Sequence, residues 1–268
     1  MSLRITQNIE ALTASRHLAH SHSAISKSME KLSSGYRINS AADDAAGLGI
    51  SESMRSQIRG LAQGQRNIQD GVSMVQTAEG NLDEVHSMLQ RIRELAVQYK
   101  NGSLDSNARN SIQNEVNQLA SEISRIGAQA QFNGTYLLNT AGTVSFQVGA
   151  NDSEQIPVTT INLANAVGTS YFQLSTTNTS DISEVDAAIT AVSSARAGFG
   201  AVQNRLEHTL SLQAAYQENL TAAESRIRDV DMAEEMVNLT KTQILQQAGT
   251  AMLAQANQAP QSVLKLLQ

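Results

Sequence analysis

The stretch from Ile50 to Tyr99 constrains the fold more than any other part of the chain. Apolar or small residues recur along it at steps of three and four, which is the pattern of a long amphipathic helix packed against other helices. They are Met54, Ile58, Leu61, Ile68, Val72, Val75, Ala78, Leu82, Val85, Leu89, Ile92, Ala96 and Tyr99. Only Gln65 interrupts the first run, and no proline falls inside it. Roughly fifty residues at about 1.5 Å each make a helix about 75 Å long, so we expect an elongated antiparallel helical bundle, mainly α.

The composition supports this fold and excludes several classes of protein. Aromatic residues make up 3% of the 268 and only two are proline, which suits aliphatic cores on long helices. Cysteine is absent, so disulfides, thiol catalysis and cysteine-based metal sites are excluded. A net charge of -6 without a basic patch gives no reason to expect nucleic-acid binding.

No segment predicts a membrane span or a cleaved secretory signal. Eighteen consecutive apolar residues occur nowhere, and the N-terminal MSLRITQNIEAL lacks an apolar run. On these grounds alone the expected location is the cytosol, unless the protein leaves the cell by a route that needs no cleaved signal.

Helical spacing also covers both ends of the chain. Residues 1–36 predict one helix, and a turn-rich connector, SSGYRINSAADDAAGLG, follows it. The final helix is expected over about 232–257, with Pro260 breaking or kinking it. Its inward-facing residues are predicted to be Val237, Ile244, Ala248, Ala251 and Gln255. We expect the first and last helices to pair antiparallel.

Two more helices are expected in the middle of the chain. One begins near Ser103–Asp105 and carries heptad spacing to Ala130, with Asn133-Gly134 ending it. Another begins at Asp181, which with Glu184 has the spacing of a helix cap and its partner.

Between these helices the apolar period changes from helical spacing to two. The alternation of Val144, Phe146 and Val148, the turn GANDS, and then Ile156 and Val158 predict a β-hairpin. Pro157 confines the second strand to an edge. Residues 159–180 are rich in Thr, Ser and Asn, and predict only loop or short strand.

The two ends of the chain are expected to need partners. A single helix from the same chain buries only about half of each apolar surface, while ordering the backbone costs free energy at every residue. We therefore predict that both termini are mobile in a monomer and become ordered in an assembly.

The candidate catalytic and metal-ligating groups favour structural roles. His17 and His20 share a helix face, but His22 points elsewhere and no carboxylate completes a metal site. Asp43-Asp44 and the acidic residues at 229–235 are expected to cap helices or complement helix dipoles. No motif of a hydrolase, metalloprotease or nucleotide-binding enzyme is present, so neither catalysis nor a cofactor is expected.

One charged run has a second interpretation beside that of a solvated helix face. In LQRIRELAVQ, Arg91, Ile92 and Leu95 form a mixed polar and apolar patch, with Arg93 and Glu94 beside it. Such a patch is a plausible docking surface for a partner.

The chain resembles the bacterial flagellins through several motifs. They are MEKLSSGYRINSAADDAAGLGISESMRSQIRGL (29–61), NIQDGVSMVQTAEGNLDEV (67–85), LQRIRELAVQ (89–98), QFNGTYLL (131–138), GAVQNRLEHT (200–209), NLTAAESRIRDVDMAEEM (219–236) and MLAQANQAPQSVLKLLQ (252–268). Only about 45 residues separate the two matching blocks, 1–140 and 185–268, so the resemblance is to a minimal form without large outer domains.

The resemblance implies a structural subunit that self-assembles into an extracellular filament for motility. Residues 1–43 and 226–268 would form the inner tube, and residues 44–225 the outer tube. The implied assembly seam of the inner tube is Ile5, Ile9, Leu12, Ile25, Met29, Leu32, Val237, Ile244, Ala251, Val263, Leu266 and Leu267. The hairpin of Val144, Phe146, Val148, Ile156 and Val158 would switch between two subunit packings.

The same resemblance implies partners. The family is exported unfolded through the secretion apparatus of the flagellum, after a chaperone binds the C-terminal segment, and its filaments meet cap and hook-associated proteins. Many flagellins are ligands of the innate receptor Toll-like receptor 5, whose contacts would fall on Arg91, Leu95 and Glu115. The final residue, Gln268, departs from the basic residue that is frequent there.

Two alternatives stay open at this point. A hook–filament junction protein shares the terminal helices, although the motifs at 67–98 and 219–236 argue against it. A coiled-coil adaptor or secreted effector would be a soluble binder, and sedimentation would separate it from a filament subunit.

Overall fold

The computed structural model describes residues 8–168, 173–175 and 181–266, with side chains described as far as residue 258. The chain divides into two compact units. The first comprises residues 1–56 and 219–268, and the second comprises residues 57–218.

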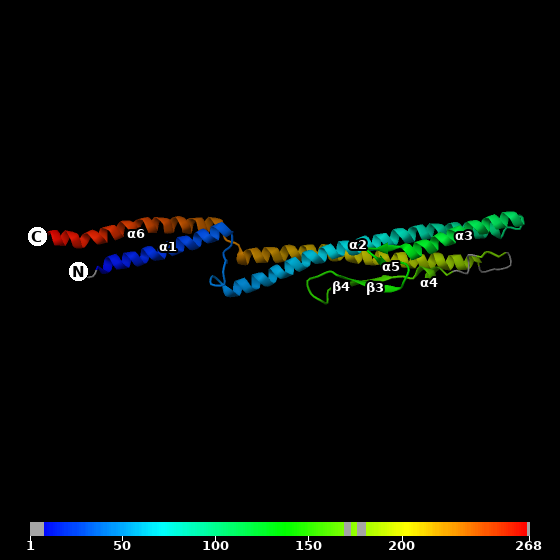
Figure 1. Ribbon diagram of the computed structural model, residues 1–268, viewed down its shortest axis with the longest axis horizontal. Helices are drawn as coiled ribbons and strands as arrows, with labels where there is room; N and C mark the ends of the chain where they lie inside the picture. The colour runs from blue at the N-terminus through cyan, green and yellow to red at the C-terminus, as the bar shows by residue number, and fades with distance from the viewer. Residues whose placement is uncertain (1–7, 169–172, 176–180, 267–268) are drawn as a thin grey trace. The chain divides into compact units, whose positions relative to one another are not determined.

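The core of the second unit is a bundle of long helices (Figure 1). They are α2 (Ala45–Tyr99), α3 (Ser106–Gln129) and α5 (Asp181–Arg228), of which α2 and α5 continue into the first unit. The predicted seam of α2 is confirmed, since its members from Leu61 to Ala96 are buried or packed against the core. Gln65, the interruption in that seam, donates to the Gln217 side chain of α5 at 2.7 Å. A hydrogen bond between two side-chain amides thus replaces the apolar contact at this position of the seam.

Helix α3 begins where the sequence predicts. Its N-cap is Asp105, whose Oδ1 accepts from the Ala108 backbone N–H at 2.8 Å. It packs with Ile112, Val116 and Ile123 buried, which confirms its heptad pattern. The end of the helix differs from prediction, because α3 stops at Gln129 rather than at Asn133-Gly134.

Asn133-Gly134 instead forms the turn of a small hairpin that the sequence analysis missed. Strand β1 (Gln131–Phe132) pairs antiparallel with β2 (Thr135–Tyr136). Both turn residues have positive φ, 47° and 82°, as a two-residue hairpin turn requires. A second missed element is α4 (Leu163–Val167), a short helix in the segment predicted to be loop or strand.

The predicted β-hairpin is confirmed, with β3 (Gly142–Gln147) antiparallel to β4 (Gln155–Thr160). Val144 faces Val158 and Phe146 faces Ile156, while Val148 is buried just beyond the end of β3. Pro157 lies in a two-stranded sheet, where each strand is an edge, as predicted.

The turn end of this hairpin packs against α2 where the helix carries small residues. A Cβ atom at Gly64 would overlap the Val148 carbonyl, and one at Gly60 would lie 2.8 Å from the Ala150 Cβ. One turn further, Asn67 donates its side-chain amide to the Gln147 carbonyl at 2.9 Å. The hairpin backbone therefore approaches the helix closely because two glycines leave room for it.

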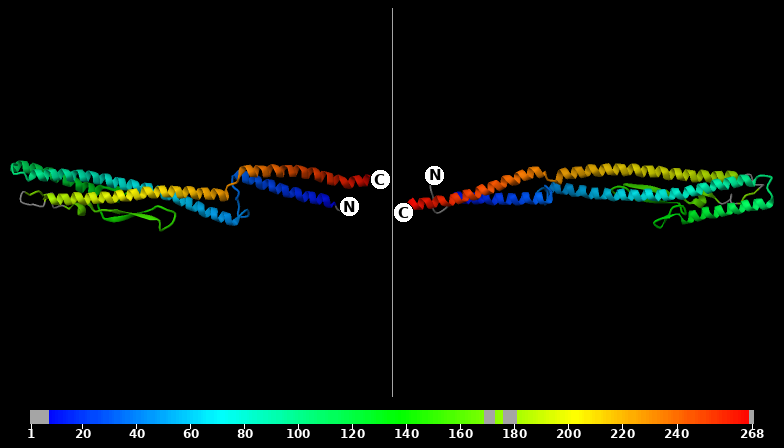
Figure 2. Two further views of the ribbon diagram at one scale, coloured as in Figure 1. Left: turned by 180° about the vertical axis from the view of Figure 1, so that it is seen from behind. Right: turned by 90° about the horizontal axis from the view of Figure 1, so that it is seen from above.

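The first unit is built on an antiparallel helix pair, α1 (Ile9–Ser34) and α6 (Met232–Leu266), called here the terminal helix pair. Figure 2 shows the two helices side by side in both views. Leu18 lies against Gly249, and Ser28 lies against Glu235, so the helices run in opposite directions, as predicted. No helix within the described ranges combines the length and apolarity needed to cross a membrane.

Two predictions about α6 are wrong. The helix does not end near residue 257 and is not broken at Pro260, the first of the two effects predicted for this proline, but continues to Leu266. Its inward face toward α1 holds residues such as Leu239 and Leu253, spaced at helical steps from Glu235 to Ala256. The residues predicted to face inward all lie exposed instead: Val237, Ile244, Ala248, Ala251 and Gln255. The more continuous apolar stripe of α6 therefore points away from α1, and the pair packs through a mixed stripe in which Leu239 and Leu253 alternate with small and polar residues.

Candidate assembly surface and charged clusters

The terminal helix pair packs through small residues together with a few large ones such as Leu18 and Leu239, and leaves other large apolar side chains exposed. Its inner positions on α1 include Ala11, Ala14, Ser21 and Ser28, at helical spacing. The large apolar side chains that lie at least half exposed on the two helices are called here the terminal apolar face: Ile9, Leu12, Met29, Met236, Val237, Ile244, Leu245 and Met252. Val237 is 68% exposed and Ile244 is 60% exposed. Exposed apolar surface of this kind marks interaction sites rather than the finished surface of a monomer.

The predicted assembly seam coincides with this face in part. Ile9, Leu12 and Met29 on α1 belong to it, as do Val237 and Ile244 on α6. Ile25 and Leu32 are half-buried, and Ala251 is exposed but small. Ile5 and Leu267 lie outside the described residues, and Val263 and Leu266 lie where the structure describes no side chains.

A shallow groove runs along the exposed side of α6. It is lined by Met236, Val237, Thr240, Lys241, Ile244 and Leu245. Lys241 brings the only charged group to this lining, so a docking partner would meet a mostly apolar surface.

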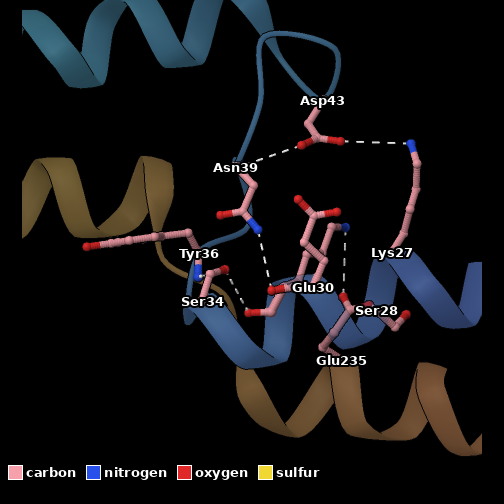
Figure 3. A network of polar contacts seen from close by, with 9 residues as sticks. Lys27, Ser28, Glu30, Ser34, Tyr36, Asn39, Asp43 and Glu235 are labelled. Carbon is pink, nitrogen blue, oxygen red and sulfur yellow. Dashed lines mark hydrogen bonds and ion pairs between the residues drawn. The ribbon is translucent and has the colours of Figure 1, made fainter.

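A polar cluster ties the start of α6 to α1 (Figure 3). Ser28, buried in the pair, donates its hydroxyl to Glu235 Oε1 at 2.5 Å, and Lys31 Nζ lies 3.9 Å from the other carboxylate oxygen. A carboxylate at such an interface is stabilised by a hydroxyl and an ammonium together. It fixes one position of the pair, since sliding either helix would leave Glu235 without partners.

The connector between α1 and α2 is shaped by Asp43 and Asp44, which do not form a carboxylate pair. Asp43 Oδ2 accepts from the backbone N–H of Ser40 at 3.1 Å, and Lys27 approaches the other oxygen at 3.8 Å (Figure 3). The hydrogen bonds from Ser40, more than the charge of Lys27, lower the pKa of the Asp43 carboxyl. Asp44 Oδ1 accepts from the Gly47 N–H at 2.8 Å, so it caps α2, as predicted.

The acidic start of α6 acts as predicted as well. Asp231 Oδ1 accepts from the backbone N–H groups of Ala233 at 2.9 Å and Glu234 at 3.2 Å. These are N–H groups that the first turn of a helix leaves without helical partners.

Hydrogen bonds join residues 35–37, which follow α1, to residues 227–230, which precede α6, and this connection is called here the strap. The sequence did not predict it. The Val230 N–H donates to the Gly35 carbonyl at 3.0 Å, and the Arg37 N–H donates to the Arg228 carbonyl at 2.6 Å. The Arg228 guanidinium lies 4.8 Å from the Tyr36 ring and donates to Glu52 at 2.7 Å. This hydrogen bond is the main cause that lowers the pKa of Glu52. No local pattern signals the strap, because its partners are nearly 200 residues apart in sequence.

Only part of the patch predicted around Arg91 lies on the surface of the protein. Ile92 and Leu95 are 0% and 1% exposed, because they belong to the seam of α2 and pack in the core. The prediction that they share a surface patch with Arg91 is therefore wrong. Arg91 itself is half exposed and donates to Glu115 Oε1 of α3 at 2.9 Å, with Glu94 at 3.2 Å. The hydrogen bond to Glu115 is the largest of the causes that raise the pKa of Arg91.

The histidines of α1 do not gather with other ligands. In the part of the chain that the structure describes, no three His, Asp or Glu side chains come together in a way that could hold a metal ion. His17 lines a groove between α1 and α6 beside Met252, where its ring is exposed.

Comparison with known proteins connects these features to one family. Residues 5–143 match the model of the bacterial flagellin N-terminal helical region, and residues 182–267 match that of the C-terminal helical region. A flagellin of Halalkalibacterium halodurans is 52% identical over 269 residues, which span 98% of this chain and 99% of that protein. A flagellin of Bacillus subtilis is 49% identical over 303 residues, 99% of this chain and 100% of that protein.

Solved structures agree with the sequence matches. The crystal structure of Bacillus cereus flagellin superposes with a TM-score of 0.50 at 30% identity, covering 55% of this chain and 88% of that one. A putative flagellar hook-associated protein from Vibrio parahaemolyticus gives a TM-score of 0.54 at 15% identity, covering 70% of this chain and 100% of that one. The second likeness concerns the fold alone.

Proposed function

Because the chain belongs to the bacterial flagellin family, we propose that it is a structural subunit that self-assembles into the flagellar filament. The observation that carries this proposal is the terminal apolar face. A chain that leaves Val237, Ile244 and Met252 mostly exposed needs copies of itself, or another protein, to cover them. Flagellins form an extracellular filament, so the expected site of action is outside the cell.

The two parts of the chain take different places in the proposed filament. Residues 1–43 and 226–268 form the inner tube, where the terminal apolar face meets neighbouring subunits. Residues 44–225 form the outer tube, with the β3–β4 hairpin as the element that switches between two packings. The seating of this hairpin bears on the switch proposal. Near its turn the hairpin approaches α2 through backbone at Gly60 and Gly64, whereas Val148, Ile156 and Val158 are buried in the core, so switching would require these side chains to repack.

Assembly is proposed to order both termini. The test compares the full chain with a fragment of residues 45–225, each seeded and spun at high speed, with the pellets imaged by negative-stain electron microscopy. Filaments are expected from the full chain and none from the fragment. If the full chain stays in the supernatant under seeding, a soluble binder becomes the better proposal.

A point substitution tests the terminal apolar face without removing residues. Ile244→Lys places a charge where the face must be covered, and should reduce the pelleted fraction at least tenfold. Gln243→Lys adds the same charge beside it without removing apolar surface, and should reduce the pellet far less. Equal loss in both variants would show that charge on α6, rather than the apolar side chain, decides assembly.

Export and the partners of the filament follow from the same surface. Before assembly the apolar side of α6 would attract other chains, so we propose that an export chaperone covers the C-terminal segment and that the chain is secreted unfolded. Filament cap and hook-associated proteins are the proposed partners at the two ends of the filament.

Recognition by Toll-like receptor 5 is proposed through Arg91 and Glu115. Both are exposed, and their ion pair could open to offer charge-assisted hydrogen bonds to a receptor. Leu95 is buried and would contribute by supporting the backbone under Arg91. Arg91→Ala should weaken receptor signalling while the variant still assembles. Arg125→Ala, which removes a similar exposed pair with Glu122 on α3, serves as the control.

A hook–filament junction protein remains the second candidate, because such a protein would share the terminal helices. Long filaments from seeded full chain would rule against it, because a junction protein forms no extended polymer by itself.

A further inference from the structure

The last turns of α6 contain a proline that does not end the helix. Proline has no backbone N–H, so it cannot donate to the carbonyl four residues earlier. For Pro260 that carbonyl belongs to Ala256, and α6 nevertheless continues to Leu266. A helix carbonyl that loses its usual donor costs free energy unless another group bonds to it.

The opposite helix supplies such a donor. Asn8 Nδ2 donates to the Ala256 carbonyl at 2.7 Å, across the terminal helix pair. The same amide group also caps α1, where Asn8 Oδ1 accepts from the Ala11 N–H at 3.0 Å. Both partners are backbone groups of fixed polarity, so only this orientation of the amide satisfies them together. One side chain thus serves a helix start and a helix carbonyl at the same time.

The contact of Asn8 with Ala256 helps to fix the register of the terminal helix pair. At the other end of the pair, Glu235 is held by Ser28 and Lys31. Between the two ends, the residues of α1 that face α6 are mostly small. A Cβ atom added to Gly249 of α6 would lie 3.6 Å from Leu18 Cδ1. Small side chains allow neighbouring registers, so the polar contacts at the ends select one.

We propose that Asn8 is a positioning residue that makes the helix beyond Ala256 conditional on the docking of α1. When α1 is absent, the Ala256 carbonyl lacks both its helical donor and Asn8, and Pro260 disfavours the helix. When α1 docks, Asn8 supplies the donor and the helix continues. The end of α6 therefore folds as part of the pair and not before it. The contact lies within one chain, and the inference rests on the proposed function because assembly is proposed to order the two termini that make this contact.

The test is amide hydrogen exchange on the full chain carrying Asn8→Asp. Aspartate keeps the oxygen that caps α1 but has no N–H to give to Ala256. Exchange over residues 257–266 should be faster by about twofold to tenfold, the range set by one net hydrogen bond. Exchange over residues 11–14 should stay unchanged, whereas Asn8→Ala should speed exchange in both segments.

A second variant separates this coupling from general damage to the pair. In a Pro260→Ala chain the alanine N–H can bond to the Ala256 carbonyl, so adding Asn8→Asp should change exchange at 257–266 by less than about twofold. Exchange is measured on the unassembled chain and on pelleted filaments, and sedimentation reports assembly separately. The proposal is overturned if Asn8→Asp has no effect in the native background or the same effect in both backgrounds. It is also overturned if residues 257–266 of the unaltered chain are unprotected in both states.

Discussion

The two units of this chain use apolar side chains in opposite ways. In the second unit, large aliphatic residues such as Leu82, Leu89 and Ile92 are fully buried among α2, α3 and α5. In the first unit, the terminal helix pair buries mostly small or polar residues and leaves large ones exposed. The second unit can therefore be stable by itself, whereas the first unit leaves apolar side chains exposed that other molecules would cover.

Removing the same side chain from the two units should give very different losses of stability. Leu89→Ala empties a fully buried site in α2 and should lower the free energy of unfolding by about 2–5 kcal/mol. Leu245→Ala acts on a half-exposed site in α6 and should change it by no more than about 0.5 kcal/mol in the unassembled chain. Urea unfolding followed by circular dichroism measures both. Similar losses in the two variants would contradict the contrast between the units.

A glycine pair on α2 tests how the hairpin is seated. Gly64→Ala puts a methyl group into the Val148 carbonyl and should destabilise the second unit by about 1–3 kcal/mol, with faster amide exchange across residues 142–160. Gly80→Ala meets nothing within 4 Å and should stabilise the helix by about 0.5–1 kcal/mol. The two variants differ only in what the new Cβ atom touches. If Gly64→Ala is also stabilising, the hairpin does not depend on this close approach.

Helix caps test whether the units unfold separately. Asp105→Ala removes the cap of α3 and Asp231→Ala removes the cap of α6, and each should cost about 1 kcal/mol. We expect the first to shift the unfolding of the second unit and the second to shift that of the first. Amide exchange resolved by segment distinguishes them. Uniform changes over the whole chain in both variants would mean that the units unfold as one.

The smallest expected effect is a pH dependence in the strap of the first unit. Arg228 lowers the pKa of Glu52, so the folded state binds this proton less readily than the unfolded state. The stabilising contribution is therefore present above the ordinary pKa of glutamate and is lost as pH falls through the lowered value. Urea midpoints measured from pH 6 down to pH 3 should fall less steeply for Glu52→Gln than for the unaltered chain. In an Arg228→Leu background, Glu52→Gln should change the slope less, because only the weaker influence of Arg55 then lowers the pKa of Glu52.

The sequence predicts the long helices well because their signal is local and repeated. The seam of α2, the start of α3 near Asp105 and the β3–β4 hairpin all follow from local spacing. Asn133-Gly134 was misinterpreted because the same dipeptide can end a helix or turn a hairpin, and β1 and β2 are only two residues each. Helix α4 is five residues long and gives too short a pattern to detect.

The candidate site was harder to predict, for a physical reason. Helix α6 carries one stripe of large apolar residues and one in which leucines alternate with small and polar residues, and hydrophobicity alone assigns the first to the interior. The pair packs through the mixed stripe, which leaves Val237 and Ile244 exposed. The strap between residues 35–37 and 227–230 and the contact of Asn8 with Ala256 depend on long-range pairing, which no local pattern reveals.

The surroundings of the glycines in α2 determine which substitutions the protein can tolerate there during evolution. At position 64 the space beside the backbone is already filled by the Val148 carbonyl, so every mutation there must displace the hairpin. At position 80 the space is open, and side chains of many sizes are admissible. Descendants of this chain should thus retain glycine at the first position and drift freely at the second, although both glycines lie on the same helix.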